Sequence, residues 1–265
     1  MTRPFFSIIV AAFNAEQLIR PTIDSVLAQD FSDYEIVVKD AASSDNTLAQ
    51  IPKDDRIRVY SEKDGGIYDG MNQGVAYATG RYLLFLNCGD YLADPSVLST
   101  VYACAKECDE ANTIVYGDYR RGGVRAKQPG TLTRFYLYRT PLCHQTVFFG
   151  SGIFQNVGMY DTQYRILADY DLTLKSFTAN ANFVYCPCVV SEYLGGGVSE
   201  SPKGRAIKRE EYRRVRNTYF SAKEQKTFER RLKLSFKGFR QKLASDNCPA
   251  CIRKLYRSVI NLVNR

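Results

Sequence analysis

The first ninety residues alternate between short apolar runs and longer amphipathic stretches. Four runs rich in β-branched and aromatic residues predict buried strands, and they cover residues 5–12, 34–39, 57–61 and 82–87. Between them, apolar positions at helical spacing predict helices over residues 14–29, with Asn14 as the cap, and 67–78. Strands that alternate with helices at this pitch predict an α/β fold with a mostly parallel central sheet.

The second half of the chain is less regular. It predicts strands over residues 113–116, 146–149 and 183–190 and a helix over residues 170–178. Three glycines at 195–197 mark the end of this body, and a charged helical pattern follows to about residue 244, with a short amphipathic helix at the end. We therefore expect a catalytic domain over residues 1–202 and a basic helical tail over residues 203–265.

Charge divides the chain at the same place. Nineteen of the 36 Lys and Arg residues but only five of the 28 acids lie in residues 203–265, so this segment carries +14 and the rest carries −6. Apolar and aromatic residues interleave with the basic ones, a pattern that favours an anionic membrane surface over a purely solvated helix. Nucleic acid is the competing polyanion, but no DNA- or RNA-binding motif accompanies the tail, so we expect no nucleic-acid partner.

The sequence also bears on the compartment. No apolar run approaches the roughly 18 residues of a membrane span, and the N-terminus lacks a signal peptide's apolar region. The expected location is therefore the cytoplasm. The eight cysteines are expected to be free thiols, because no secretory signal accompanies them.

Acidic residues stand where the predicted strands end. Asp40 closes the second strand, Asp90 follows the fourth in Asn87-Cys88-Gly89-Asp90, and Asp169 and Asp171 open a later helix. Open α/β sheets bind ligands at the carboxyl ends of their strands, so these carboxylates suggest a site for a metal, a nucleotide and a base. Asp is also an ordinary turn and cap residue, and for Asp171 we favour that structural role.

Other polar residues allow two interpretations. Asp64 could contact a nucleoside or brace the Gly65-Gly66 turn, and Asn72 on the following helix could belong to the site or anchor the helix. His144 is the only histidine, so a histidine-based metal cluster is excluded. It could hydrogen-bond a diphosphate or an acceptor, or it could be a satisfied core residue.

The first loop excludes several classes of nucleotide-binding protein. The segment after the first strand contains no G-x-G-x-x-G and no G-x-x-x-x-G-K-[ST], so neither a dinucleotide fold nor a P-loop is indicated. It also lacks the glycine-rich loop with Arg that is typical of sugar nucleotidyltransferases. A diphosphate must then be held in another way, and a divalent cation that bridges carboxylate and phosphate oxygens is the obvious device.

Taken together, these motifs resemble the family 2 glycosyltransferases of the GT-A fold. The likeness is strongest to bacterial enzymes of exopolysaccharide and glycolipid assembly, such as the colanic acid type. The matching segments follow the family's order and are residues 7–15, 40–47, 61–74, 78–90, 143–145, 168–172 and 196–199.

This resemblance implies inverting transfer of a sugar from a UDP- or GDP-linked nucleotide-diphospho-sugar. Asp40 would bind the nucleobase, Asp90 would ligate Mg²⁺ or Mn²⁺ on the donor diphosphate, and Asp169 would be the base that deprotonates the acceptor hydroxyl. The remaining implied contacts are Asn14, Asp64, Asn72, Cys88 and Gly89 for the donor, and His144, Gln145 and Asp171 for the acceptor or diphosphate.

The sequence departs from the family pattern in three places. Ala41 and Ala42 replace glycines, Gly89 replaces an acid, and Ala168 replaces the first acid of an E-D pair. Asp90 is then expected to be the only protein carboxylate on the metal. The basic tail suggests a glycan or polyprenyl-diphosphate-linked acceptor at the inner face of the bacterial cytoplasmic membrane. The alternative is a catalytically silent sugar-nucleotide-binding or membrane-scaffold protein of the same fold.

Overall fold

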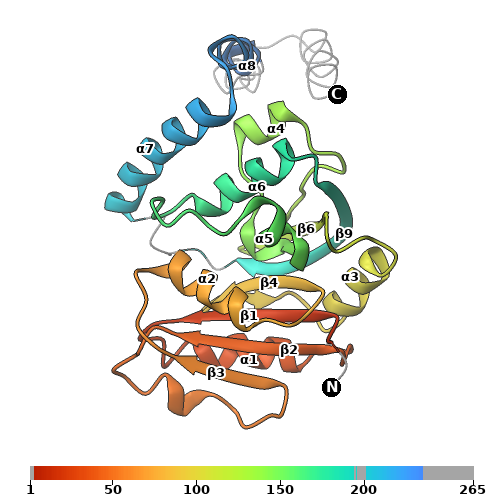
Figure 1. The fold of residues 1–265 in the computed structure, drawn as a ribbon, viewed down its shortest axis with the longest axis vertical. Coiled ribbons are helices and arrows are strands. Elements are labelled where there is room, and N and C mark those ends of the chain that lie inside the picture. The colour runs from red at the N-terminus through yellow and green to blue at the C-terminus, as the bar shows by residue number, and fades with distance from the viewer. Residues whose placement is uncertain (1–2, 194, 196–200, 235–265) are drawn as a thin grey trace, which may run out of the picture. The chain divides into compact units, whose positions relative to one another are not determined.

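A computed structural model describes residues 3–193, 195 and 201–234 (Figure 1). Contacts divide the chain into two compact units, one up to Val215 and one from Arg216 onward. The short amphipathic helix expected at the end of the chain lies outside the described residues. The expected boundary at residues 202 and 203 stays a prediction.

In the described part of the chain, nine strands form one sheet. Its order is β3-β2-β1-β4-β8-β6-β9-β5, and β7 pairs with β6 beside this path. The strands are β1 (Phe6–Ala12), β2 (Tyr34–Asp40), β3 (Ile57–Ser61), β4 (Tyr82–Asn87), β5 (Tyr91–Leu92), β6 (Thr113–Arg121), β7 (Val124–Ala126), β8 (Val147–Gly150) and β9 (Asn182–Tyr193). β3, β2, β1 and β4 are parallel neighbours, β8 runs antiparallel to β4 and β6, and β6 pairs with β9 in parallel. The predicted α/β fold is confirmed.

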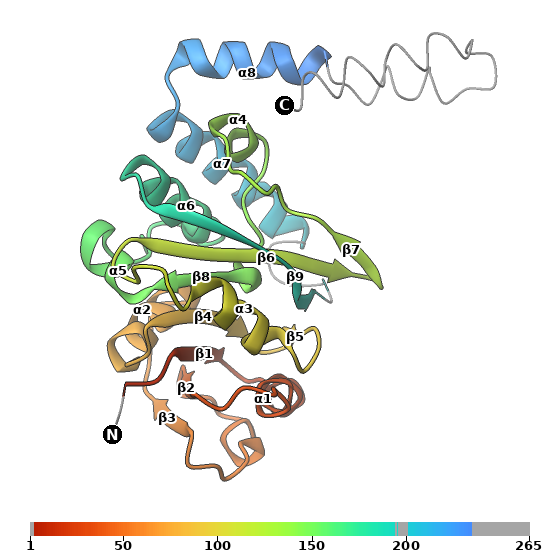
Figure 2. The same ribbon diagram turned by 90° about the vertical axis from the view of Figure 1, so that its right-hand side faces the viewer.

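Helices cover both faces of the sheet. The helices of the described residues are α1 (Ile19–Leu27), α2 (Ile67–Tyr77), α3 (Val97–Ala105), α4 (Arg134–Arg139), α5 (Ser151–Val157), α6 (Ala168–Thr178), α7 (Pro202–Tyr219) and α8 (Ala222–Leu234), with 3-10 turns η1 (Leu48–Gln50) and η2 (His144–Thr146), and the helices that cover the sheet come from the unit up to Val215. Figure 2 shows α1 and α3 on one face and α2 and α5 on the other. Because both faces are covered, β1 and β4 are buried almost throughout, which explains their continuous apolar sequences.

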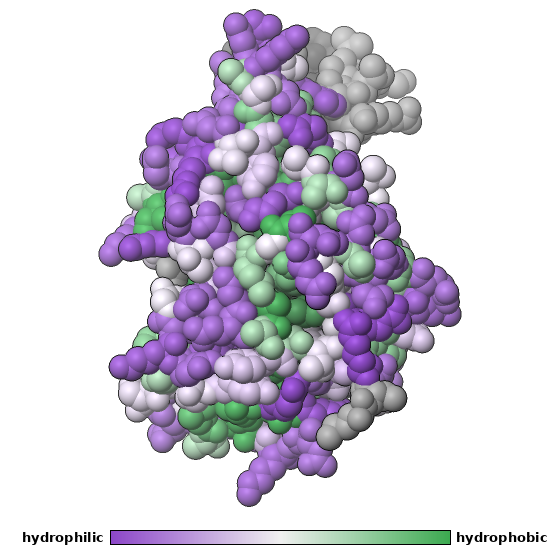
Figure 3. Space-filling model, in the orientation of Figure 1, coloured by the Kyte–Doolittle hydropathy of each residue, from purple (hydrophilic) through white to green (hydrophobic). Residues whose placement is uncertain are grey.

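The core lies between the sheet and its helices. On one face, Ile8 and Val10 of β1 are buried in one cluster with Ile23 and Val26 of α1. On the other, a Cβ atom at Gly74 of α2 would lie 2.6 Å from Ile9 Cγ2, so only glycine allows α2 to approach β1 this closely. Polar residues cover most of the surface visible in Figure 3, where apolar residues emerge only in small groups.

Asn14 does not cap α1, contrary to the sequence prediction. The helix begins at Ile19, after Leu18, with no side-chain cap. Asn14 instead adopts φ +46°, its backbone N–H donates to Ser43 Oγ (2.8 Å), and its Oδ1 accepts from Ser44 N–H (2.9 Å). Asn tolerates left-handed backbone better than most residues, and here it joins the loop after β1 to the loop after β2.

The charged helix predicted after the glycines is two helices. α7 ends at Tyr219, and α8 begins at Ala222 with a reciprocal cap at its first turn. Ser221 N–H donates to Glu224 Oε2 (2.9 Å), and Glu224 N–H donates to Ser221 Oγ (3.3 Å). This S-x-x-E pattern is a capping box, and it explains why the helical pattern restarts there.

Candidate active site

The carboxyl ends of β1, β2 and β4 place the candidate residues at one edge of the sheet. Ala12 is paired in register with Asp40, and Ala11 is paired with Asn87. Asp90 follows Asn87 in a turn in which Asp90 N–H donates to the Asn87 carbonyl (2.9 Å). The predicted convergence of the Asp40 and Asp90 segments on one edge follows from this register.

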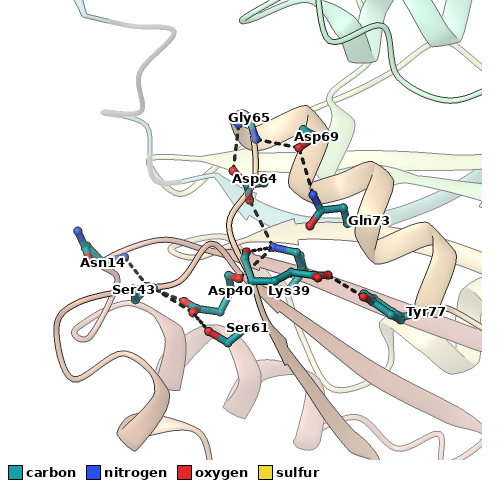
Figure 4. Close-up of polar contacts among 12 residues, drawn as sticks. Asn14, Lys39, Asp40, Ser43, Ser61, Asp64, Gly65, Asp69, Gln73 and Tyr77 are labelled. Atoms are coloured by element: carbon teal, nitrogen blue, oxygen red, sulfur yellow. Dashed lines mark hydrogen bonds and ion pairs between the residues drawn. The ribbon is translucent and has the colours of Figure 1, made fainter.

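Asp40 is fully buried and its carboxylate is held by three hydrogen bonds (Figure 4). Ser43 donates through both its N–H (3.0 Å) and its hydroxyl, and the Ser61 hydroxyl donates from the end of β3 (2.6 Å). Asp40 therefore fixes the loop after β2 against the neighbouring strand.

A buried lysine lies next to Asp40. The Lys39 side chain is fully buried, and its Nζ donates to the carbonyls of Asp40 (2.9 Å) and Glu62 (2.7 Å) and lies 3.5 Å from Asp64 Oδ2 (Figure 4). Asp64 Oδ1 accepts from Gly66 N–H (3.0 Å). Asp64 thus braces the Gly65-Gly66 turn before α2, which is the structural role that the sequence allowed for it. Lys39 joins that turn to β2.

The loop after β2 is strained at one residue. Ala42 has φ +57°, a left-handed conformation that costs a residue with a Cβ atom about 1–2 kcal/mol. Replacing Ala42 by Gly is therefore expected to raise the free energy of unfolding by about 1 kcal/mol.

Chemical denaturation checks this prediction, and Ala41→Gly is the matched control. Ala41 is outside the left-handed region, so the control should lose about 0.5–1 kcal/mol through added freedom of the unfolded chain. Equal losses in both variants would contradict the assignment of strain to Ala42.

Gln145 orients the Asp90 carboxylate. Asp90 is 8% exposed, and Gln145 Nε2 donates to its Oδ1 (3.0 Å). Burial raises the pKa of the Asp90 carboxyl, while neighbouring His144 and the Gln145 hydrogen bond act in the opposite direction. A largely buried carboxylate with one oxygen held by Gln145 is suited to bind a cation with the other.

His144 connects the same turn to Asp169. Its Nε2 lies 3.1 Å from Asn87 Nδ2, and its Nδ1 lies 3.8 Å from Asp169 Oδ2. His144 and Gln145 are consecutive in η2, so one short turn contacts both Asp169 and Asp90. The structure therefore brings together two carboxylates that are far apart in the sequence.

Asp169 lies in the first turn of α6 and is only 17% exposed through its side chain. Its Oδ1 accepts from Tyr170 N–H (2.9 Å) and from the Tyr68 hydroxyl (3.2 Å). Burial raises the pKa of the Asp169 carboxyl, and nearby His144 and these hydrogen bonds partly oppose the shift. A raised pKa makes a carboxylate a stronger base.

Cys88 and Gly89 occupy the turn between Asn87 and Asp90. Burial, with the charges of Asp40 and Asp90, raises the pKa of the Cys88 thiol to about 12, so this thiol stays protonated at neutral pH. Gly89 has φ +99°. An acid at this position would be strained, which gives a physical reason for glycine here.

Two other predicted residues make contacts within the protein. Both ends of the Asn72 amide bond the backbone of Tyr160, at 2.9 Å and 3.0 Å. Asp171 is buried with its Oδ2 3.7 Å from Lys175 Nζ. Asn72 therefore anchors α2, and Asp171 forms an ion pair with Lys175 one turn further along α6. A donor role for Asn72 and an acceptor role for Asp171 stay predictions.

Glu211 of α7 is a residue that sequence reasoning missed. Its carboxylate accepts from three successive backbone N–H groups, those of Arg165 (2.6 Å), Ile166 (3.0 Å) and Leu167 (2.9 Å). Leu167 precedes α6, which has no side-chain cap of its own. Glu211 therefore positions the first turn of the helix that carries Asp169, across a separation of more than 40 residues that leaves no local signal.

Replacing Glu211 by Gln is expected to lower the free energy of unfolding by about 1–3 kcal/mol, because an amide NH₂ would face a backbone donor. The matched control is Glu210→Gln. Glu210 is 71% exposed through its side chain and pairs only with Arg213 on the same helix, so a change within about 0.5 kcal/mol is expected. Equal thermal shifts for both variants would exclude the capping role.

The fold and the strand-end carboxylates define a GT-A glycosyltransferase. The model of the family described as "Glycosyl transferase family 2" matches residues 7–158, and the chain therefore belongs to this family. A PGL/p-HBAD biosynthesis glycosyltransferase of Mycobacterium bovis is 36% identical over 210 residues, which cover 76% of this chain and 81% of that one. An uncharacterized glycosyltransferase of Mycobacterium tuberculosis is 32% identical over 211 residues, which cover 77% and 80%.

Solved structures support the same fold. TarS of S. aureus (residues 1–349), in complex with UDP-GlcNAc, has a TM-score of 0.61 at 18% identity, over 77% of this chain and 64% of that one. The mannosyltransferase PcManGT of Pyrobaculum calidifontis, in complex with GDP-Man and Mn²⁺, has a TM-score of 0.58 at 16% identity, over 98% and 70%. The chain spans only 39% of the longer TarS chain.

Proposed function

We propose that this enzyme is an inverting, divalent-metal-dependent glycosyltransferase that moves a sugar from a nucleotide-diphospho-sugar to a glycan or lipid-linked acceptor. The observation that supports this most directly is the convergence of Asp90 and Asp169 on the His144–Gln145 turn. Inversion needs one base opposite the leaving group, whereas hydrolases of glycosides use a pair of carboxylates. Asp169 supplies that single base in our proposal.

The donor would lie along the edge formed by β1, β2 and β4. Asp40 is fully buried, so it would recognise the nucleobase by exchanging one of its hydrogen bonds to Ser43 or Ser61, and the loop that joins Asn14 to Ser43 would border the base. In support, TarS is solved with UDP-GlcNAc and PcManGT with GDP-Man. Cys88 and Gly89 would contact the donor between Asp40 and Asp90.

Asp90 would hold Mg²⁺ or Mn²⁺ on the donor diphosphate. In the described ranges no group of three or more His, Cys, Asp and Glu is arranged to hold a metal ion. A single carboxylate suits Mg²⁺, which commonly keeps waters and substrate phosphates as its other ligands. When bound, the cation would stabilise negative charge on the leaving diphosphate. The Mn²⁺ in the PcManGT complex supports this use of a metal.

Asp169 would take the proton of the acceptor hydroxyl as that oxygen attacks the anomeric carbon. Its Oδ1 is fixed by Tyr170 and Tyr68, so Oδ2 is the oxygen that would accept the proton. His144 Nδ1 lies 3.8 Å from Oδ2 and would contact the acceptor or the diphosphate. Asn87 would in turn hold the imidazole in place.

The tail would hold the enzyme on an anionic membrane surface at the inner face of the bacterial membrane. Residues 220–265 contain twelve Lys and Arg against three acids, and each basic residue near an anionic leaflet contributes roughly 1 kcal/mol. None of the described helices is both long and apolar enough to cross a membrane.

Truncation after Tyr219 is expected to abolish binding to vesicles that contain anionic lipid, since it removes those twelve basic residues. The cut keeps Glu211, so the turn before α6 stays capped. Sedimentation with anionic and zwitterionic vesicles measures the effect. Unchanged sedimentation of the truncated protein at low salt would contradict the membrane role.

A screen of UDP- and GDP-linked sugars by thermal shift, with Mn²⁺ or with EDTA, tests the proposed function. One donor should raise the melting temperature only with the cation, because a ligand at a hundred times its Kd adds about 2.7 kcal/mol. Radiolabel transfer to a bacterial lipid extract should then follow with that donor. Binding without transfer would favour the catalytically silent sugar-nucleotide-binding alternative, and the absence of metal-dependent binding for every donor would overturn the proposed function.

A further inference from the structure

Three cysteine thiols lie together away from the candidate active site. Cys104 is on α3, and Cys186 and Cys188 are on β9. Cys104 Sγ lies 2.7 Å from Cys186 Sγ, and Cys186 Sγ lies 3.6 Å from Cys188 Sγ. All three are free, Cys186 is fully buried, and the other two are partly exposed.

Neither packing nor metal binding accounts for this arrangement. Cys186 belongs to the apolar core cluster, but apolar packing alone gives no reason for three sulfur atoms in a row. Among the described residues, no group of three or more His, Cys, Asp and Glu is arranged to hold a metal ion. The chemistry left for adjacent thiols is exchange with a disulfide.

Cys186 and Cys188 differ in acidity and in access to solvent. The hydrogen bond between them raises the pKa of the Cys186 thiol, with burial adding to the effect, and the same bond lowers the pKa of Cys188. Cys188 is therefore the thiol of the pair that loses its proton more readily, and it is also partly exposed. Thiolate character and access are what make a cysteine reactive.

We propose that Cys104, Cys186 and Cys188 form a redox site that takes a low-molecular-weight disulfide as its oxidant and ends as a Cys104–Cys186 disulfide. The Cys188 thiolate attacks one sulfur of the small disulfide, which forms a mixed disulfide and releases one small thiol. Cys186 attacks Cys188 Sγ and releases the second small thiol.

Cys104 then attacks Cys186 Sγ, and Cys188 leaves again as a thiolate. Two protein thiols lose two electrons, the small disulfide gains them, and the two thiol protons end on the two small thiols.

The product would join α3 to β9 across 82 residues of sequence. β9 also pairs with β5, the short strand directly after Asp90, through Tyr91 and Glu192. The covalent link would therefore tie α3 to the strand that supports the Asp90 turn. This inference depends on the thiol geometry, with the acidity and exposure of Cys188 selecting the attacking group, and stands apart from the proposed sugar transfer.

Oxidised glutathione is the probe, applied to the full chain and followed by peptide mapping with mass spectrometry. The expected product is a cross-link between the peptides that contain Cys104 and Cys186, with no glutathione retained. Fragmentation distinguishes Cys104 from Cys88, and the Cys248–Cys251 pair falls on other peptides.

Three single variants make the test specific. Cys188→Ser should slow the cross-link about tenfold, because the thiolate that starts the exchange is absent. Cys104→Ser should stop at a glutathione adduct or a Cys186–Cys188 disulfide. Cys108→Ser is the matched control, since Cys108 Sγ donates to the Cys104 carbonyl (3.5 Å) and has no hydrogen bond to Cys186 or Cys188 among the described contacts, and it should cross-link at the wild-type rate.

Two results would overturn the proposal. One is the absence of a Cys104–Cys186 cross-link in both the folded wild-type protein and the Cys108→Ser protein. The other is an equal cross-linking rate in the wild type and in the Cys188→Ser protein. Complete cross-linking is also expected to raise the melting temperature, because a disulfide constrains the unfolded chain.

Discussion

Replacing Asp169 by Asn is expected to lower the turnover number about 10²–10⁴-fold and to leave donor binding intact. The Asn side chain keeps an oxygen for Tyr170 N–H and the Tyr68 hydroxyl, so the fold of this turn is retained. It cannot accept the proton of the acceptor hydroxyl, and general-base catalysis contributes a factor of this size. Initial rates and donor titrations on the same preparation separate the two effects.

Asp171→Asn is the matched control, two residues further along α6. Asp171 is buried and lies 3.7 Å from Lys175 Nζ, so its replacement should change stability more than turnover. If Asp171→Asn abolished transfer and Asp169→Asn did not, the base would be Asp171.

The pH dependence of the stability of the Asp169→Asn protein tests the raised pKa of Asp169. Burial raises the pKa of the Asp169 carboxyl above its ordinary value of 3.8, so the folded state holds this proton more tightly than the unfolded state does. Stability from this group is therefore present below about pH 3.8 and is lost as the pH rises through the raised value. At neutral pH the variant should be at least as stable as the wild type, and the difference should disappear in acid.

Replacing Asp90 by Asn is expected to have the second large effect on catalysis. We expect the metal-dependent part of donor binding to be lost and kcat/KM to fall about 10²-fold, because the carboxylate that would hold the cation becomes a weak neutral ligand. A loss of this size corresponds to about 3 kcal/mol of transition-state stabilisation. Donor titrations at several Mn²⁺ concentrations measure it.

Asp24→Asn controls for the loss of one negative charge. Asp24 is about half exposed and pairs with Arg20 on α1, so metal-dependent binding should be unchanged. Full metal dependence in the Asp90→Asn protein would show that another group holds the cation.

Most strands and helices of the first half of the fold could be predicted from the sequence, because each of these is specified by a local pattern of apolar residues. The strands over 57–61 and 82–87 are found where the apolar runs predicted them, and α2 ends one residue before the predicted end. α3 was missed because Val97, Thr100 and Val101 are β-branched and blur a helical pattern. α4 has six residues, too few for a periodicity to be recognised.

The candidate site divides in the same way. Strand-end carboxylates such as Asp40 and Asp90 are readable from the sequence, because parallel strands end at a common edge. The approach of His144 to Asp169 depends on β8 lying between β4 and β6, an order that no local pattern specifies. Glu211 and Asn87 act on residues distant in the chain, so only the structure identifies their roles.

The central claim is that Asp90 and Asp169 serve one transferred sugar from opposite sides. A crystal structure with Mn²⁺ and the intact donor, obtained with the Asp169→Asn protein to prevent turnover, measures this most directly. The account predicts Mn²⁺ on Asp90 and the donor diphosphate, with the anomeric carbon facing the side chain at position 169. Mn²⁺ bound away from Asp90, or a sugar whose anomeric carbon faces away from position 169, would contradict it.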